Sequence, residues 1–222
     1  MKKIISRYYF IMAILLVIAY QYLSGLILHS DFALGLSDFG YYLSDMTLHF
    51  LVILITLIFM VQSRKWQEIN SKKFRWSYLF YCVLAFLLLF LWNRVTFSLF
   101  PPTRNAISYQ HYAPTFTGAT AFLMYFFYPV IAGPIFEDMI YRGLVMTALE
   151  KGKKWGLDVL GSAILFGILH ISSHGWVLTD FVFYMGGGLI FAVLFRMTKS
   201  IYWPIGLHIV YNGIGQILML LH

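Results

Sequence analysis

Long apolar runs constrain the fold of this chain more than any other feature. They alternate with short basic segments, and most approach the length of about 20 residues that a helix needs to cross a bilayer. Of the 222 residues, 60% are hydrophobic and only 11% are charged, whereas soluble domains carry about 25% charged residues. A soluble domain could not hide so much apolar surface. The sequence therefore predicts an all-α, multi-pass bundle of transmembrane helices.

Seven segments are predicted to span the membrane. They are residues 8–28, 46–62, 77–93, 117–134, 156–172, 177–195 and 201–221. The first is longer than a signal-peptide core and no small-residue cleavage site follows it, so we expect it to remain as an uncleaved span. We interpret residues 1–222 as a single membrane domain, with N-terminal spans in 1–116 and a polar-residue-bearing core in 117–222.

The net charge of +7 comes from basic clusters that lie between the apolar runs. These clusters fall on one side of a seven-span chain, which predicts a cytoplasmic N-terminus in a cell membrane. This distribution does not favour nucleic acid as a partner; the lipid bilayer is the expected surroundings. The single cysteine, Cys82, excludes an intramolecular disulfide and a cysteine-based metal site.

Three ionisable residues lie close together after the fourth span: Glu137, Asp138 and Arg142. Each would cost about 2.5–3.5 kcal/mol at the centre of a membrane helix if it had no partner. Asp138 and Arg142 are four residues apart, so on a helix they share a face and can pair. The acids follow Gly133-Pro134, where we expect the fourth span to break or kink before it continues as a second helical piece.

Glu137 points about 100° away from Asp138 on a helix and needs other partners. The two histidines deep in later spans, His170 and His208, are the expected ones. Asn212 follows His208 by four residues and shares its face, while Phe166, four before His170, is interpreted as a packing residue. Three helices therefore offer one acid, two imidazoles and one amide that can converge.

Each of these residues also has an ordinary structural explanation. A histidine can bond a backbone carbonyl, an asparagine can join two helices, a glutamate can reach water, and an acid–arginine pair can be purely structural. Together, however, an acid, an arginine and two histidines within a membrane indicate function. His174 could join them, although residues 172–175 look like a turn. His29, His49, His111 and His222 are placed at span ends or in loops without a functional signal, and Gly186–Gly188 is read as a close helix–helix contact.

The order Glu137-Asp138-x-x-x-Arg142, Phe166-x-x-x-His170, His208-x-x-x-Asn212 resembles the CAAX protease and bacteriocin-processing (CPBP) family, also called the CAAX prenyl protease 2 or Abi family. The resemblance covers about Pro134 to Asn212. The family pattern has a second glutamate where this chain has Asp138, which is one methylene shorter. Asp138 can still pair with Arg142, but the site would be weakened if that acid must reach another group.

The resemblance implies an intramembrane endopeptidase with its catalytic core in residues 117–222. Glu137 would be the general base that activates water, helped by His170, while His208 and Asn212 would stabilise the oxyanion. Asp138, Arg142 and Phe166 would support them. Glu137, His170 and His208 could alternatively hold a divalent metal such as zinc. The absence of a His-Glu-x-x-His pattern favours a metal-free site, so either no cofactor or zinc is expected.

The expected substrate is a peptide or a membrane protein, and the small, plain chain suggests a bacterial source. The resemblance also implies possible roles in bacteriocin self-immunity or peptide processing. A different class of function is a non-catalytic scaffold or immunity protein that binds a sensor kinase or a transporter. A small transporter is disfavoured because no inverted repeat is present.

Overall fold

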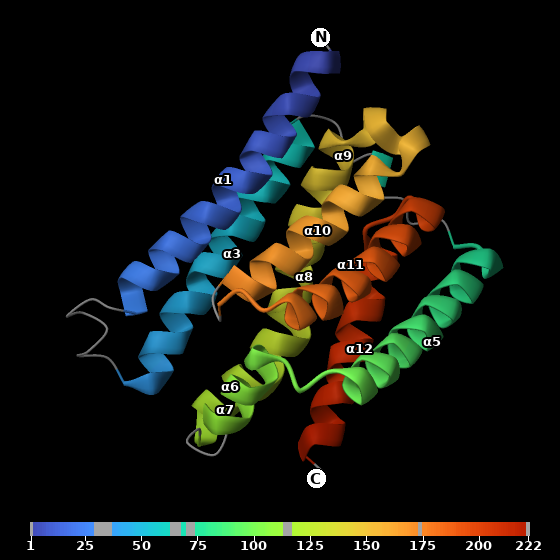
Figure 1. The fold of residues 1–222 in the computed structure, drawn as a ribbon. Coiled ribbons are helices and arrows are strands. Elements are labelled where there is room, and N and C mark those ends of the chain that lie inside the picture. Colours follow the sequence, from blue (N-terminus) through green and yellow to red (C-terminus); the bar gives the residue numbers. More distant parts are fainter. Residues whose placement is uncertain are drawn as a thin grey trace.

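The computed structural model of this chain describes residues 2–28, 37–62, 68–69, 74–112, 117–172 and 175–220. These ranges are almost wholly helical and form no sheet, as the sequence predicts. The longer helices are α1 (Lys2–Leu28), α3 (Asp38–Gln62), α5 (Trp76–Leu99), α6 (Arg104–Tyr112), α10 (Leu157–Ser172), α11 (Leu178–Thr198) and α12 (Tyr202–Leu220). Figure 1 shows them as a bundle, with α1 and α3 side by side.

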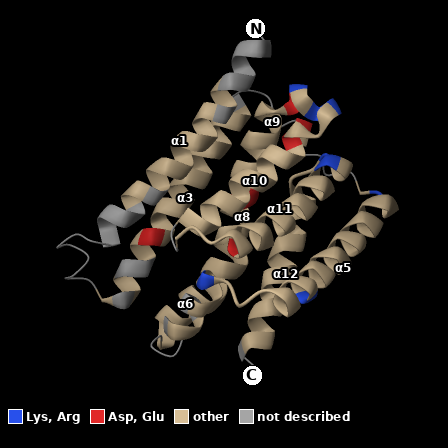
Figure 2. Ribbon diagram, in the orientation of Figure 1, with Lys and Arg blue, Asp and Glu red and all other residues tan. Residues whose placement is uncertain are grey.

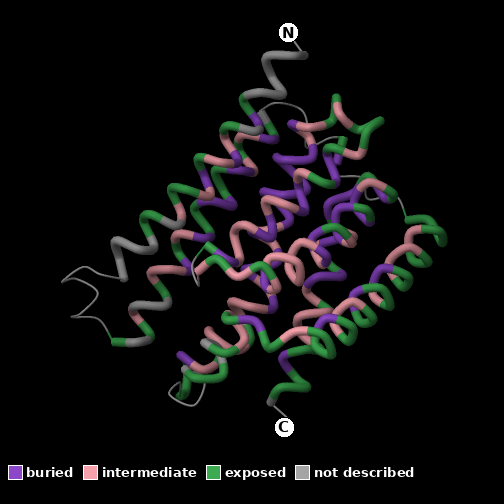
Figure 3. The backbone as a smooth tube through the Cα atoms, viewed as in Figure 1, coloured by how far each residue is buried: buried purple, intermediate pink, exposed green. Residues whose placement is uncertain are grey.

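A continuous helical stretch from Gly118 to Ala148 lies at the centre of the bundle. It consists of α7 (Gly118–Phe122), η2 (Leu123–Ala132), α8 (Gly133–Asp138), η3 (Met139–Val145) and α9 (Met146–Ala148). Helices α1 and α3 pack against it, and so do α10 and α12. Figure 3 shows the buried residues concentrated there, and every residue of η3 is buried. A helix that is buried on all sides must satisfy its polar side chains within the protein.

Of the predicted break or kink near Gly133-Pro134, the break is wrong, because the helix continues through both residues; its type changes there from the π-helical η2 to the α-helical α8. The backbone N–H of Gly133 bonds to the carbonyl of Tyr128, five residues earlier, which is π-helical bonding. Proline has no N–H to donate to the preceding turn. In the wider π-helical turn the backbone hydrogen bonds shift by one residue around the position that lacks an N–H, so the helix can continue past the proline.

All seven predicted spans are helical, but fewer meet the length and hydropathy expected of a membrane-crossing helix. Four do so among the described residues: Leu43–Val61, Trp76–Leu99, Gly118–Ala148 and Leu178–Thr198. Ile11–Tyr20 and Leu157–Ser172 are shorter apolar helices. At about 1.5 Å per residue, a helix as short as α10 falls below the hydrocarbon thickness of about 30 Å. The predicted all-α, multi-pass bundle is confirmed, and its count of seven spans is approximate.

The outer surface of the bundle carries large apolar side chains. Phe80, Leu87, Leu91 and Leu99 of α5 are all exposed, as are many others on α1 and α3. Contiguous apolar surface of this kind is rare on soluble proteins and is the surface that lipid solvates. The structure thus agrees with the composition: this is a membrane protein.

The basic residues gather mainly at one end of the bundle. Figure 2 shows Lys and Arg around η4 (Glu150–Trp155) and the C-terminal end of α11. By the positive-inside rule, this end would face the cytoplasm. The side on which the N-terminus lies remains a prediction.

The segment from Arg94 to Thr115, predicted to be a loop, is largely helical. α5 continues to Leu99, and α6 begins at Arg104. The Asp180 carboxylate of α11 accepts a hydrogen bond of 2.9 Å from the Arg104 backbone N–H, and Thr103 Oγ1 accepts one of 3.2 Å from the Ala106 N–H. These bonds satisfy donors at the start of α6 that would otherwise have no partner.

The predicted close contact at Gly186–Gly188 is confirmed. A Cβ on Gly186 would overlap the Trp92 ring of α5, and one on Gly188 would lie 3.1 Å from Phe166 of α10. The missing side chains let α11 approach two helices at once. They also leave the Gly188 carbonyl accessible to a side chain of the central helix.

Candidate active site

Asp138 and Arg142 form an ion pair in the centre of the protein. Both side chains have 0% exposure, and Arg142 Nε lies 3.1 Å from Asp138 Oδ1. The two groups are close but not aligned as a hydrogen bond, so the contact is chiefly ionic. Arg142 Nη2 donates to the Gly188 carbonyl at 3.1 Å. The predicted pairing of Asp138 with Arg142 is therefore confirmed.

Two aromatic rings hold the guanidinium in place. Arg142 Cζ lies 4.9 Å from the centre of the Phe166 ring and 5.3 Å from that of Phe191. A cation near the face of a ring is attracted by the ring's quadrupole, and this attraction is stronger away from water. Phe166 also contacts His170, with ring centres 4.5 Å apart. Phe166 thus packs between the arginine and the first histidine.

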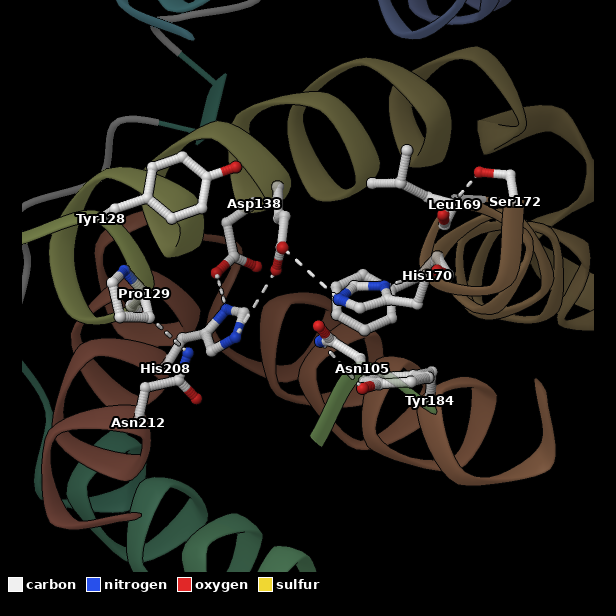
Figure 4. A network of polar contacts seen from close by, with 12 residues as sticks. Asn105, Tyr128, Pro129, Asp138, Leu169, His170, Ser172, Tyr184, His208 and Asn212 are labelled. Carbon is white, nitrogen blue, oxygen red and sulfur yellow. Dashed lines mark hydrogen bonds and ion pairs between the residues drawn. The ribbon is translucent and has the colours of Figure 1, made fainter. Parts of the chain in front are cut away.

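Glu137 faces two imidazoles that come from different helices. Its Oε1 lies 3.5 Å from Nε2 of His170 in α10, and its Oε2 lies 3.6 Å from Nε2 of His208 in α12. The Glu137 side chain is 17% exposed, so it is largely but not completely enclosed. Figure 4 shows the imidazoles of His170 and His208 on opposite sides of the cluster.

The opposite nitrogen of each imidazole is held by a hydrogen-bond acceptor. His170 Nδ1 lies 2.9 Å from the Phe166 carbonyl oxygen, and His208 Nδ1 lies 3.1 Å from Asp138 Oδ2. Because a carbonyl and an ion-paired carboxylate accept, both Nδ1 atoms carry hydrogen. The two Nε2 atoms are therefore directed at Glu137, and the rings are fixed by their other ends.

Asp138 reaches two partners despite its short side chain. One oxygen faces Arg142, and the other accepts from His208. A glutamate would place its carboxylate one methylene farther from the helix. The departure from the family pattern therefore leaves Asp138 in contact with both groups.

Asn212 binds the central helix. Its Nδ2 donates to the Pro129 carbonyl at 2.9 Å. This carbonyl lies in the π-helical stretch, and Pro134, five residues later, has no N–H to donate to it. Asn212 thus satisfies a backbone acceptor and retains a second N–H on the same nitrogen.

The cluster opens into a cavity of about 930 Å³. Glu137, His170, His208 and Asn212 all line it. A second set of polar side chains on its wall comes from residues for which the sequence predicts no role; it comprises Tyr20, Asp45, His49, Asn93, Asn105, Tyr128, Tyr184 and Tyr211. The N-terminal helices therefore contribute to the same space as the catalytic candidates.

The interpretation of His49 as a span-end residue is wrong. His49 lies within the span Leu43–Val61, is only 2% exposed, and bonds Tyr128 through Nε2 at 3.1 Å. Its place four residues after Asp45, inside an apolar run, is a sequence signal that could have identified it. His111 is exposed in α6, whereas His29, His174 and His222 lie outside the described residues.

The carboxylate of Glu137 and the imidazoles of His170 and His208 are donor types that zinc binds. Zinc bound by nitrogen and oxygen needs three protein ligands about 2.0–2.2 Å from one point, and an open position for water. In the part of the chain that the structure describes, no group of three His, Cys, Asp or Glu side chains has an arrangement that could hold a metal ion. Glu137 lies 3.5 Å from His170 and 3.6 Å from His208, and a metal-free site remains a prediction.

Comparison with known proteins gives two matches in the same region. Residues 119–214 match the family described as type II CAAX prenyl endopeptidase Rce1-like. A Bacillus subtilis (strain 168) protein named "Putative membrane peptidase YdiL" is 33% identical over 90 residues, which are 40% of this chain and 35% of that protein. The matched part is thus about a third of that relative's length. No solved structure matches the chain. The matched region contains Glu137, His170, His208 and Asn212 with the spacing described above, and this part of the chain is similar to the type II CAAX prenyl endopeptidase Rce1-like family.

Proposed function

We propose that this protein is an intramembrane endopeptidase that hydrolyses a peptide bond with water activated by Glu137. One observation carries the proposal: the Glu137 carboxylate lies 3.5 and 3.6 Å from two imidazoles at a cavity inside a membrane bundle. A carboxylate in this position can accept a proton from a water molecule. The Rce1-like match supports the same class of reaction.

The reaction needs one proton to pass through Glu137. Water donates this proton to the carboxylate while its oxygen bonds to the substrate's carbonyl carbon. Glu137 then returns the proton to the amide nitrogen as the C–N bond breaks. His170, whose Nδ1–H is fixed on Phe166, would hold the water with Nε2. General acid–base catalysis of this kind contributes about 10²–10⁴-fold.

The developing oxyanion needs donors on the other side of the substrate carbonyl. His208 and Asn212 lie on one face of α12 and both line the cavity. Asp138 accepts from His208 Nδ1 and so fixes the ring with Nε2 directed toward Glu137; Nε2 is the atom that would donate to the oxyanion. Asn212 has one remaining N–H after it bonds Pro129. A single oxyanion donor of this kind is worth about 3 kcal/mol.

Replacing His170 with alanine tests the role of the first imidazole. We expect the turnover of liposome-reconstituted protein on apolar peptides to fall by about 10²-fold, because the water loses its acceptor. Fragments would be quantified by mass spectrometry. His111→Ala, at an exposed position of α6, is the matched control and should cleave at the wild-type rate. Equal cleavage by His170→Ala and the wild type would end this assignment.

The proposed mechanism uses no metal, and elemental analysis tests this directly. We expect purified, active protein to contain far less than one zinc per chain and to keep its rate in the presence of a chelator. The reason is that, within the described ranges, no three His, Cys, Asp or Glu side chains are grouped as a metal site. One tightly bound metal per chain, lost together with activity, would overturn the metal-free mechanism while leaving the hydrolase intact.

A further inference from the structure

Two asparagine–tyrosine pairs line the cavity outside the catalytic cluster. Asn93 of α5 donates from Nδ2 to the Tyr211 hydroxyl of α12 at 2.8 Å. Asn105 of α6 donates from Nδ2 to the Tyr184 hydroxyl of α11 at 3.1 Å. Both asparagines precede residues 119–214, so the family match does not include them. All four side chains line the same cavity as Glu137.

The hydrogen bonds fix the orientation of the first amide. The Tyr211 hydroxyl donates its only hydrogen to the Leu89 carbonyl at 3.3 Å, so it can only accept from Asn93. Asn93 therefore presents its Nδ2 to the tyrosine and directs Oδ1 elsewhere. No described residue donates to that oxygen or takes the second N–H of the amide.

The second pair adjoins the catalytic histidine. The Tyr184 ring stacks on His170 with centres 4.1 Å apart and an angle of 20°. Figure 4 shows Asn105 and Tyr184 next to His170. Thr103 and Asp180 cap the start of α6, so the backbone that carries Asn105 is fixed. Within the described ranges, Asn105 likewise has an amide oxygen that accepts from no protein donor.

A substrate cut inside a membrane creates a need for such groups. A helix or strand that opens for cleavage exposes backbone N–H and C=O groups, and each one without a partner costs several kcal/mol away from water. A primary amide offers one acceptor and one donor side by side, which matches one peptide unit. Among the described residues that line the cavity, Asp45 and Glu137 are carboxylates and none is a lysine or arginine, so this part of the wall offers no Lys or Arg cation for a substrate carboxylate.

Resting on the proposed proteolysis, we propose that Asn93 and Asn105 bind the main chain of an extended, uncharged peptide segment across the cavity. Tyr211 and Tyr184 are positioning residues that hold each amide in its orientation. The site would therefore recognise an internal stretch of a membrane polypeptide by its backbone, with little dependence on side chains.

The test measures binding apart from cleavage. Fluorescent Leu/Ala decapeptides would be titrated against the inactive Glu137→Gln protein in micelles, alone and combined with Asn93→Ala or Asn105→Ala. A matching peptide series replaces one backbone amide at a time by an ester, which removes one N–H donor. We expect each asparagine variant to weaken binding about 3- to 10-fold, the value of one neutral hydrogen bond.

The ester series distinguishes recognition from folding. In the Glu137→Gln background, an ester at one position of the peptide should weaken binding by a similar factor. That loss of affinity should vanish when the asparagine that binds this backbone position is replaced by alanine. Thr96→Val is the matched control: Thr96 is a buried α5 residue whose hydroxyl bonds only its own helix, and it should leave ester sensitivity intact. Three results would overturn the proposal. They are unchanged affinity in the asparagine variants, a loss of affinity on ester substitution that persists in both variants, and no peptide binding at all. Proteolysis itself is judged separately, by cleavage with the wild-type protein.

Discussion

Glu137→Gln should reduce peptide cleavage by about 10²–10⁴-fold, which is the usual contribution of a general base. Glutamine preserves the size of the side chain and can still bond to His170 and His208. It cannot accept a proton from water, so the first step of the proposed reaction is lost. Initial rates of fragment release from reconstituted protein would give the change in kcat, and retained membrane insertion would show that folding is unaffected.

Glu150→Gln provides the matched control, because Glu150 is exposed in η4 and does not line the cavity. We expect that variant to cleave at the wild-type rate. A Glu137→Gln protein with normal turnover would exclude the catalytic role. The wild-type protein could also show no measurable cleavage. If Glu137→Gln then fully restored a cellular phenotype, a scaffold or immunity role would replace the enzyme proposal.

The sequence was sufficient to predict the contacts that depend on helical spacing or on the cost of buried charge. Asp138 and Arg142 are four residues apart, and their pairing follows from helix geometry alone. His170 and His208 were expected near Glu137 because an unpartnered acid in the membrane is costly, and both imidazoles lie within 3.6 Å of it. The class of fold followed from composition in the same way.

The remaining features depend on how helices pack, which spacing does not reveal. The π-helical turns around Pro129 and Pro134 keep the central helix unbroken, although local propensity favours a break. His49 lies on the cavity wall only because α3 packs against that helix. Asn105 enters the site on a helix that the sequence suggested was a loop. Such contacts between distant segments carry no periodic signal.

The ion pair of Asp138 and Arg142 makes the second strong prediction, which concerns stability. Arg142→Leu removes the cation and leaves a carboxylate with 0% exposure in the core. Breaking a buried pair in this way costs about 3–5 kcal/mol, because the remaining charge is neither solvated nor balanced. We expect the free energy of unfolding, measured by denaturant titration in bicelles, to fall by about that amount. The Asp138 carboxylate, which accepts from His208 Nδ1, would also lose the cation beside its other oxygen.

Two further variants separate the pair from simple loss of packing. Adding Asp138→Asn to Arg142→Leu removes the uncompensated charge and should recover part of the lost stability. Arg196→Leu is the comparison, since Arg196 binds Asp158 with 26% of the Arg196 side chain and 5% of the Asp158 side chain exposed; because water reaches this cation, we expect a smaller loss than at Arg142. If Arg142→Leu cost no more than Arg196→Leu, the central ion pair would not be what stabilises Asp138. The hydrogen bond from His208 Nδ1 would then be the remaining contact to the Asp138 carboxylate, and Asp138→Asn would not recover stability in the double variant.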